Sequence, residues 1–154
     1  MIVTEYPNCS ISLMEESDIT ELAENLRNQD VVEISGLGAT NEFACQQSYL
    51  NSHKKFTVRL NNNKLVACFG VGSVTDDIGM IWMLGTKYIK DIKNTLLRHG
   101  RDWVTHLMIG YDFVYNVVHT QNTVSIKWLK WLGAKFLDNP APEGYQYFRL
   151  GGDA

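Results

Sequence analysis

The side chains that could do chemistry in this sequence are few and scattered. His119 directly follows an apolar segment, Asp112–Val118, that reads as a strand. Imidazole is the side chain most often used as a general base near neutral pH, so His119 is the candidate catalytic residue. The alternative is an ordinary loop histidine. Four tyrosines offer a hydroxyl or ordinary sheet packing: Tyr111, Tyr115, Tyr145 and Tyr147.

Metal-binding and nucleophile motifs are missing from the sequence. His99 and His106 are seven residues apart, and no carboxylate stands at ligand spacing between them. The three cysteines, Cys9, Cys45 and Cys68, lack the close spacing of zinc ligands. No serine or cysteine lies in a recognisable nucleophile motif. We therefore expect no metal site and three reduced, packed thiols.

The bulk composition is that of an ordinary globular protein. The chain has 154 residues, 45% of them hydrophobic and 20% charged, with a formal net charge of −3. This length predicts one domain over residues 1–154. The charge argues against broad capture of nucleic acid. Without a signal peptide or an apolar run near ~18 residues, we expect neither secretion nor membrane insertion.

The segment Asn122–Leu137 predicts a capped helix, a glycine stop and a return strand. Asn122 is a good N-cap, and Gly133 can adopt the left-handed conformation that ends a helix. The apolar residues between them spread over more than half of the helix circumference, so we expect a largely covered helix. Replacing the central Trp128 with alanine should cost ~3–5 kcal/mol. Replacing Lys127, on the polar side, should cost no more than ~0.5 kcal/mol.

The rest of the chain alternates between strand and helix patterns. The long apolar segment Ile78–Leu84 predicts a central strand, and a helix from about Asp91 to Met108 joins it to Asp112–Val118. Such a crossover predicts neighbouring parallel strands. Gly70 and Gly72 indicate a bulge or bend. The other predicted elements are a strand at Cys9–Met14, helices beginning at Ser17 or Asp18 and at Thr40 or Asn41, a hairpin of Phe56–Leu60 with Leu65–Val71, and strands at Ala134–Leu137 and Tyr145–Leu150.

The stretch that follows the strand before Asn122 resembles a known superfamily. The order is a strand, then Asn122-Thr123-Val124-Ser125-Ile126, then Leu132-Gly133, then another strand. This resembles the last βαβ unit of the GNAT superfamily, the acyl-CoA-dependent N-acyltransferases. The resemblance implies an α/β (or α+β) domain with a mixed, mostly antiparallel sheet. We expect six or seven strands, about four helices and a central parallel strand pair.

The resemblance also implies where acetyl-CoA would bind. In GNAT enzymes the strand corresponding to Ile78–Leu84 pairs with the pantetheine arm, and a glycine-rich turn after it holds the pyrophosphate at a helix start. The resemblance also places His119 near the mouth of the cofactor cleft. The implied cofactor-binding residues in this chain are Met83, Leu84, Gly85, Lys90, Lys93 and Asn122.

Three positions depart from the GNAT pattern. The turn that begins at Gly85 lacks the family's other closely spaced glycines and carries Asp91, whose charge repels phosphate. Leu129 stands seven residues after Asn122, where the family commonly has a proton-donating tyrosine. The segment Gly79–Leu84 contains no carboxylate to act as a base. We therefore expect weak or absent acetyl-CoA binding and degenerate catalysis. The alternative is an active acetyl-CoA-dependent N-acetyltransferase with an atypical phosphate-binding turn.

A second resemblance is narrower. The run Lys127-Trp128-Leu129-Lys130-Trp131-Leu132-Gly133 is similar to the small GNAT-like internal virion proteins of short-tailed phages. It implies a protein of the virion interior or of the cytoplasm of an infected host cell. We expect it to act by binding a virion or host protein, with no specific nucleic acid and no membrane as partner.

Overall fold

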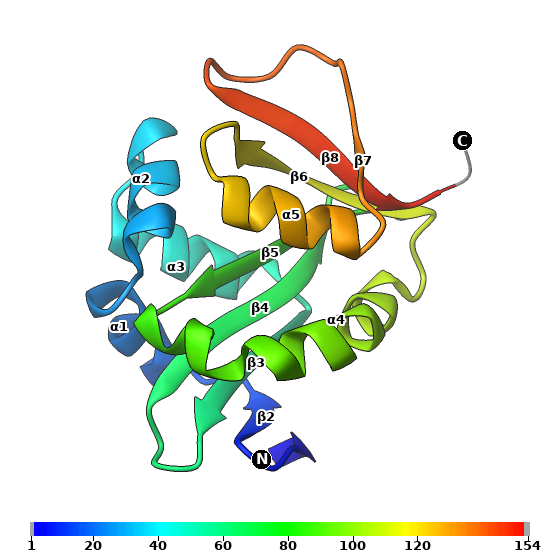
Figure 1. Cartoon of the computed structure of the whole chain (residues 1–154). Coiled ribbons are helices and arrows are strands. Elements are labelled where there is room, and N and C mark those ends of the chain that lie inside the picture. Colours follow the sequence, from blue (N-terminus) through cyan, green and yellow to red (C-terminus); the bar gives the residue numbers. More distant parts are fainter. Residues whose placement is uncertain (1, 153–154) are drawn as a thin grey trace.

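The computed structural model describes residues 2–152, which form one mixed sheet with helices on both faces (Figure 1). The sheet order is β1-β2-β3-β4-β5-β6-β8-β7. The strands are β1 (Ile2–Glu5), β2 (Cys9–Leu13), β3 (Lys54–Leu60), β4 (Leu65–Ser73), β5 (Ile78–Gly85), β6 (Phe113–His119), β7 (Lys135–Phe136) and β8 (Tyr145–Gly151). The helices are α1 (Glu16–Glu24), α2 (Asn28–Gly36), α3 (Asn41–Asn51), the 3-10 helix η1 (Lys87–Ile92), α4 (Lys93–Met108) and α5 (Thr123–Trp131).

The predicted fold class is confirmed. Strands β5 and β6 are parallel neighbours in the middle of the sheet, and every other pairing is antiparallel. The described residues contain eight strands rather than six or seven, and five α-helices rather than about four. The prediction missed β1 and α2 and placed the start of α1 too late. Asp18 lies inside the first turn of α1, and its carboxylate accepts the backbone N–H of Glu15 at 2.9 Å.

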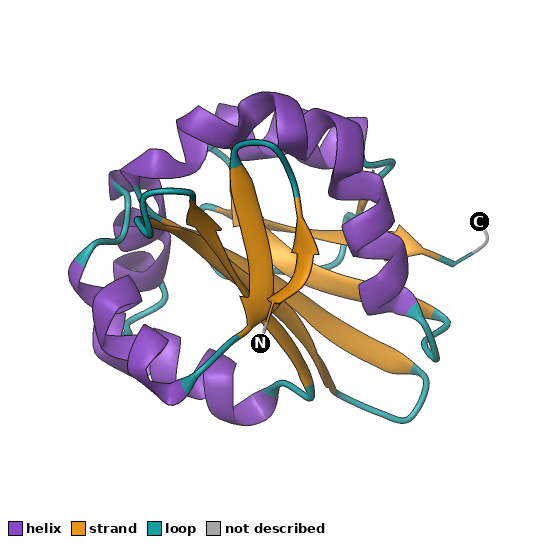
Figure 2. Ribbon diagram, turned by 90° about the horizontal axis from the view of Figure 1, so that it is seen from below, coloured by secondary structure: helices purple, strands orange, loops and turns teal. Residues whose placement is uncertain are grey.

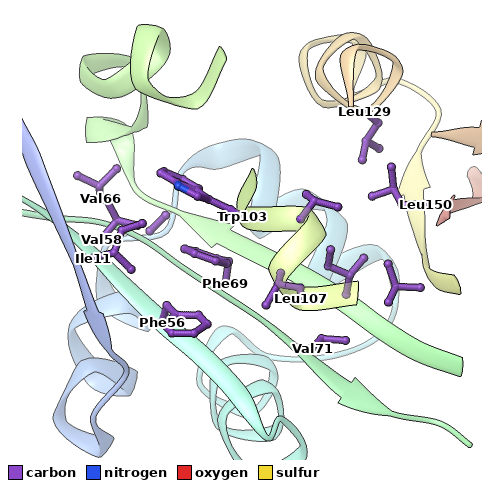
Figure 3. Packing of buried hydrophobic residues seen from close by; sticks show 14 of the residues in the cluster. Ile11, Phe56, Val58, Val66, Phe69, Val71, Trp103, Leu107, Leu129 and Leu150 are labelled. Atoms are coloured by element: carbon purple, nitrogen blue, oxygen red, sulfur yellow. The ribbon is translucent and has the colours of Figure 1, made fainter. Parts of the chain in front are cut away.

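Two apolar layers sandwich the sheet (Figure 2). One layer is formed by α4 and α5 and contains Phe69, Trp103 and Leu107. Trp103 stacks on Phe69 with ring centroids 5.4 Å apart and an interplanar angle of 7° (Figure 3). The other layer is formed by α1 and α3 and is smaller. The three cysteines are buried, as predicted, and burial raises the pKa of Cys45 and of Cys68 to about 12.

Helix α5 begins and ends as predicted but is covered less than expected. The side chain of Asn122 accepts the N–H of Ser125 at 3.2 Å, and Gly133 has a φ of 92°. Of the residues of α5, Leu129 is the buried one, whereas Val124 is 62% exposed and Trp131 is 46% exposed. The prediction of a largely covered helix is therefore wrong. Composition shows that a helix is apolar, but the neighbours decide how much of it is covered.

Gly70 and Gly72 do not mark a bulge, because β4 pairs with β5 in unbroken register through both glycines. Each glycine instead permits a close backbone approach. A Cβ atom at Gly70 would come within 2.3 Å of the carbonyl oxygen of Lys54, and one at Gly72 within 2.2 Å of that of Asn51. The end of α3 and the start of β3 can therefore pack closely against β4.

Candidate functional site

The central parallel strands form a fork. β5 and β6 pair through Ile78–Met80 and Phe113–Tyr115, and there the ladder ends. β5 continues along β4 as far as Gly85, whereas β6 continues along β8 as far as His119. Beyond this point each strand stays paired only with its antiparallel partner, β5 with β4 and β6 with β8. We call the separated segments, residues 81–85 and 116–119, the fork.

Part of the backbone edge of β5 inside the fork, at Ile81 and Gly85, is bonded to the protein's own groups. The side-chain amide of Asn116, on β6, donates to the carbonyl oxygen of Ile81 at 2.6 Å. The N–H of Gly85 donates to Asp30 Oδ2 at 2.8 Å, and its carbonyl oxygen accepts the N–H of Arg27 at 2.9 Å. Because alternate strand residues turn their backbone groups to the same edge, Met83 faces the fork between these two bonded positions.

Asp30 is the most deeply buried carboxylate at the fork. It is 3% exposed, and it also accepts Arg27 Nε at 2.9 Å. This pair holds the start of α2 against the end of β5, where Leu26 and Thr86 form an isolated bridge. Sequence reasoning missed Asp30 and Arg27. The helix that Arg27 caps was itself not predicted, and the contact of Asp30 with Gly85 spans 55 residues, so it had no local signal.

The turn after Gly85 is wound into a helix and closed by Thr86. The Thr86 hydroxyl donates to the carbonyl of Leu65 at 2.6 Å and accepts the N–H of Tyr88 at 3.3 Å. The chain then continues as η1 and α4 without an open loop. Lys90 and Lys93 are exposed here, and so is Asp91 between them. Whether the two lysines contact a phosphate stays a prediction.

The far end of the fork is bridged by Glu33 of α2. Glu33 Oε1 accepts the N–H of His119 at 3.2 Å and the side-chain amide of Asn122 at 2.8 Å. The Glu33 carbonyl accepts the Tyr145 hydroxyl at 2.7 Å. Burial, followed by the charge of Glu33, raises the pKa of Tyr145. Glu33 therefore ties α2 to β6, α5 and β8, a role that sequence reasoning missed.

The candidate base His119 lies at the fork but is already engaged. Its ring Nδ1 accepts the N–H of Gln121 at 3.1 Å. With Nδ1 as acceptor, the neutral ring carries its proton on Nε2, so it presents a donor rather than a basic lone pair. The ring also packs edge-on against Tyr145, with centroids 5.1 Å apart. In this arrangement His119 can donate a hydrogen bond but is not set to remove a proton.

The other predicted site residues lie on both sides of the fork. Met83, Leu84 and Gly85 lie on the β5 side of the fork, and Asn122 lies on the α5 side. Both polar atoms of the Asn122 side chain are used, one on Glu33 and one as the cap of α5. Leu129 is 8% exposed and packs in the core with Leu150 (Figure 3), so no proton donor stands at that position.

The remaining candidate groups lie elsewhere. Tyr111 lies on the loop before β6, and its hydroxyl is hydrogen-bonded to Ser73 and His53. The rings of Tyr115 on β6 and Tyr147 on β8 contact each other. Two surface cavities, of about 220 and 540 Å³, adjoin the N-terminal strands and contain no residue of the fork. Residues 2–152 contain no cluster of three or more His, Cys, Asp or Glu side chains arranged for a metal ion. In the same range, no helix is both long and apolar enough to cross a membrane.

Comparison with known proteins relates this chain to others through its fold. No protein family matches the sequence, and no curated protein matches it either. Many solved structures do match. The structure of AAC(6')-Ib in complex with ribostamycin and coenzyme A has a TM-score of 0.68 at 17% identity, covering 93% of each chain.

Two further structures give the same result. Spermidine N-acetyltransferase from Vibrio cholerae, in complex with CoA and spermine, has a TM-score of 0.64 at 9% identity, covering 92% of this chain and 94% of that one. A GNAT-family acetyltransferase from Bacillus anthracis has a TM-score of 0.59 at 15% identity, covering 97% and 98%. At these identities the likeness shows the fold alone. The chain has the GNAT acetyltransferase fold.

Proposed function

We propose that this GNAT-fold protein has lost acetyl transfer and acts by binding a protein partner, in a phage virion or on a component of the infected host. The observation that carries the proposal is the partly occupied edge of β5. A cofactor arm that extended its pairing beyond Met83 would have to displace Asn116 from Ile81, or Asp30 and Arg27 from Gly85. The phage setting is supported by the Lys127–Gly133 resemblance.

Three further features support the loss of catalysis. The turn that would hold a pyrophosphate has the single glycine Gly85 and is wound into η1. Leu129 is apolar and buried at the position where a proton donor is expected. His119 uses Nδ1 to accept the N–H of Gln121. A missing proton transfer alone can lower a rate by ~10²–10⁴-fold.

Calorimetric titration with acetyl-CoA tests this proposal. We expect no binding at micromolar ligand for the wild-type protein and no acetylation of generic amines. An Asn116→Ala variant frees the Ile81 carbonyl, so any latent site should gain affinity in that variant first. Ser125→Ala, at a neighbouring half-buried position outside the β5 edge, serves as the matched control.

Micromolar binding with amine acetylation would support the alternative, an active acetyl-CoA-dependent N-acetyltransferase with an atypical phosphate-binding turn. In that case His119→Ala decides the role of the histidine. Loss of activity in this variant would make His119 the base or the acid of the reaction. Unchanged activity would remove His119 from the site.

A further inference from the structure

The two faces of the sheet carry opposite charge. The segment 15–51, which contains α1, α2 and α3, has eight carboxylates and a single arginine. Three of the carboxylates are in ion pairs, Asp18 and Glu21 with Arg59 of β3 and Asp30 with Arg27. The exposed ones are Glu15, Glu16, Glu24 and Glu42. On the opposite face, η1, α4 and α5 carry seven lysines and arginines against two aspartates. Figure 2 shows these two groups of helices on either side of the sheet. The net charge of −3 therefore conceals a strongly polarised molecule.

The basic face is centred on the exposed side of α5. Val124, Lys127 and Trp131 are exposed and follow one another at helical spacing. Trp131 is 46% exposed, yet it is held in place. Its indole N–H donates to the carbonyl of Leu97 at 3.3 Å, and its own carbonyl accepts Arg101 Nη2 at 2.7 Å. The Arg101 guanidinium lies 4.5 Å from the centre of the indole ring.

A fixed, exposed tryptophan beside an arginine is typical of the residues that dominate protein interfaces. Because the ring is already ordered, binding through it loses little conformational entropy. Leu97, 39% exposed, and Val124 extend the apolar part of this surface. Phosphate recognition would use the charges here but has no need of these apolar side chains.

The acidic face has a matching apolar surface on α2 and α3. Phe43 is 51% exposed and Leu50 is 60% exposed, and both lie on the outer side of α3 beside Glu42. Val32 of α2 is 47% exposed, and Leu37, which directly follows α2, is 49% exposed. Glu42 is exposed and has no salt bridge to any residue of the described part of the chain.

We propose that the α2/α3 face of one copy docks on the α4/α5 face of a second copy. Each face supplies exposed apolar side chains, and the exposed Glu42 of α3 is opposite in charge to the lysines and arginines of the α4/α5 face, which favours encounter. The two surfaces are different, so the contact is head-to-tail and builds a chain of copies or a closed ring. This inference does not depend on the proposed function, because the docking surfaces lie outside the fork and do not require that a cofactor be bound there or absent.

Sedimentation velocity over a range of protein concentrations tests the docking. At low salt we expect sedimentation coefficients that rise with concentration. At 1 M salt the rise should weaken, because charges are then screened beyond about 3 Å. Lys127→Glu and Glu42→Lys should each weaken self-association at least about tenfold, because each places like charges face to face.

An equimolar mixture of the two charge-reversed variants should associate again, since each then meets a partner of opposite charge. The matched control is Lys64→Glu, the same charge change on an exposed lysine of the β3–β4 turn, which should associate like the wild type. Trp131→Ala provides a second test on the basic face that leaves every charge in place and should also weaken association. Circular dichroism confirms that each variant is folded.

Three results would overturn the proposal. The first is a wild-type protein that is monomeric at all concentrations in low salt. The second is association that Lys127→Glu and Glu42→Lys leave unchanged. The third is a monomer that binds a single-stranded oligonucleotide in a fluorescence anisotropy titration and loses that binding in Lys127→Glu. That third result would assign the α4/α5 face to a polyanion.

Discussion

Helices α4 and α5 lie on the same face of the sheet, but they are buried to very different extents. In α5, five of nine residues are hydrophobic, compared with six of sixteen in α4. Nevertheless α4 buries Trp103, Val104 and Leu107, whereas α5 buries Leu129. α4 crosses strands with continuous ladders, and α5 lies over the arm where β6 has left β5. The composition of a helix therefore does not by itself set how much of it is covered.

The largest effect should come from the centre of the α4 contact. Trp103 is 9% exposed, stacks on Phe69 and donates its indole N–H to the Tyr6 hydroxyl at 2.8 Å. Trp103→Ala should lower the free energy of unfolding by ~3–5 kcal/mol, because it leaves a large cavity and an unpaired hydroxyl. Urea denaturation measures this. A loss below that of Trp128→Ala would contradict the contrast between the two helices.

Trp128 of α5 should matter less than its central place in the sequence pattern predicts. Its ring lies against Gly100 of α4, where a Cβ atom would come within 3.2 Å of it, but the side chain is only half-buried. Trp128→Ala should cost ~2–3 kcal/mol, below the ~3–5 kcal/mol of a fully buried aromatic, because part of the ring stays in solvent. Trp128→Phe should cost less, since it keeps a ring there and removes a buried N–H without a partner. Equal losses for the two variants would show that the packing against Gly100 is unimportant.

The hydrogen bonds of Glu33, which link α2 to β6 and α5, should have an intermediate effect on stability. Glu33→Ala removes the acceptor of both the His119 N–H and the Asn122 side-chain amide. We expect a loss of ~1–2 kcal/mol in the free energy of unfolding, the usual cost of unpaired buried donors. Glu33→Gln retains an acceptor oxygen and should lose about half as much. Hydrogen exchange should show the loss of protection at the start of α5, and unchanged protection there would argue against a tether.

The smallest effect should come from the exposed side of α5. Lys127 is exposed and has no salt bridge to any residue in the range 2–152. Lys127→Ala should change the free energy of unfolding by no more than ~0.5 kcal/mol. The same urea series measures it, and a larger loss would mean that the outer surface of α5 is covered within a single chain.

The sequence predicted most of the fold because its signals are local. The strand at Phe56–Leu60, the turn at Asn63, the cap at Asn122 and the stop at Gly133 each depend on a few neighbouring residues, and each is present in the structure. The predicted burial of one face of that strand is wrong, because Thr57 is buried as fully as Phe56 and Val58 between helices on both faces of the sheet. What the sequence hid were elements with weak periodicity. β1 is exposed at every residue and α2 buries two residues, so neither has a strong apolar pattern.

The candidate site was predicted only in outline. Resemblance indicated the end of β5, Gly85 and Asn122 as parts of a GNAT site. The structure places Gly85 in the fork and Asn122 at the start of α5 beside it, and their role in binding a cofactor stays a prediction. Resemblance could not indicate that Asn116, Asp30 and Glu33 bond into the same region. Their partners lie 35, 55 and 89 residues away along the chain, at Ile81, Gly85 and Asn122.

The sequence by itself determined the order of the elements, their caps and turns, and the absence of closely spaced glycines after Gly85. These properties follow from backbone preferences and periodicity over a few residues. Only the tertiary structure decided that β5 and β6 separate after Met80, which polar side chains fill the separated edge, and how little of α5 is buried. Those outcomes depend on which strands pair and on hydrogen bonds between distant segments. A buried polar group must form a hydrogen bond, and the fold decides which partner is close enough.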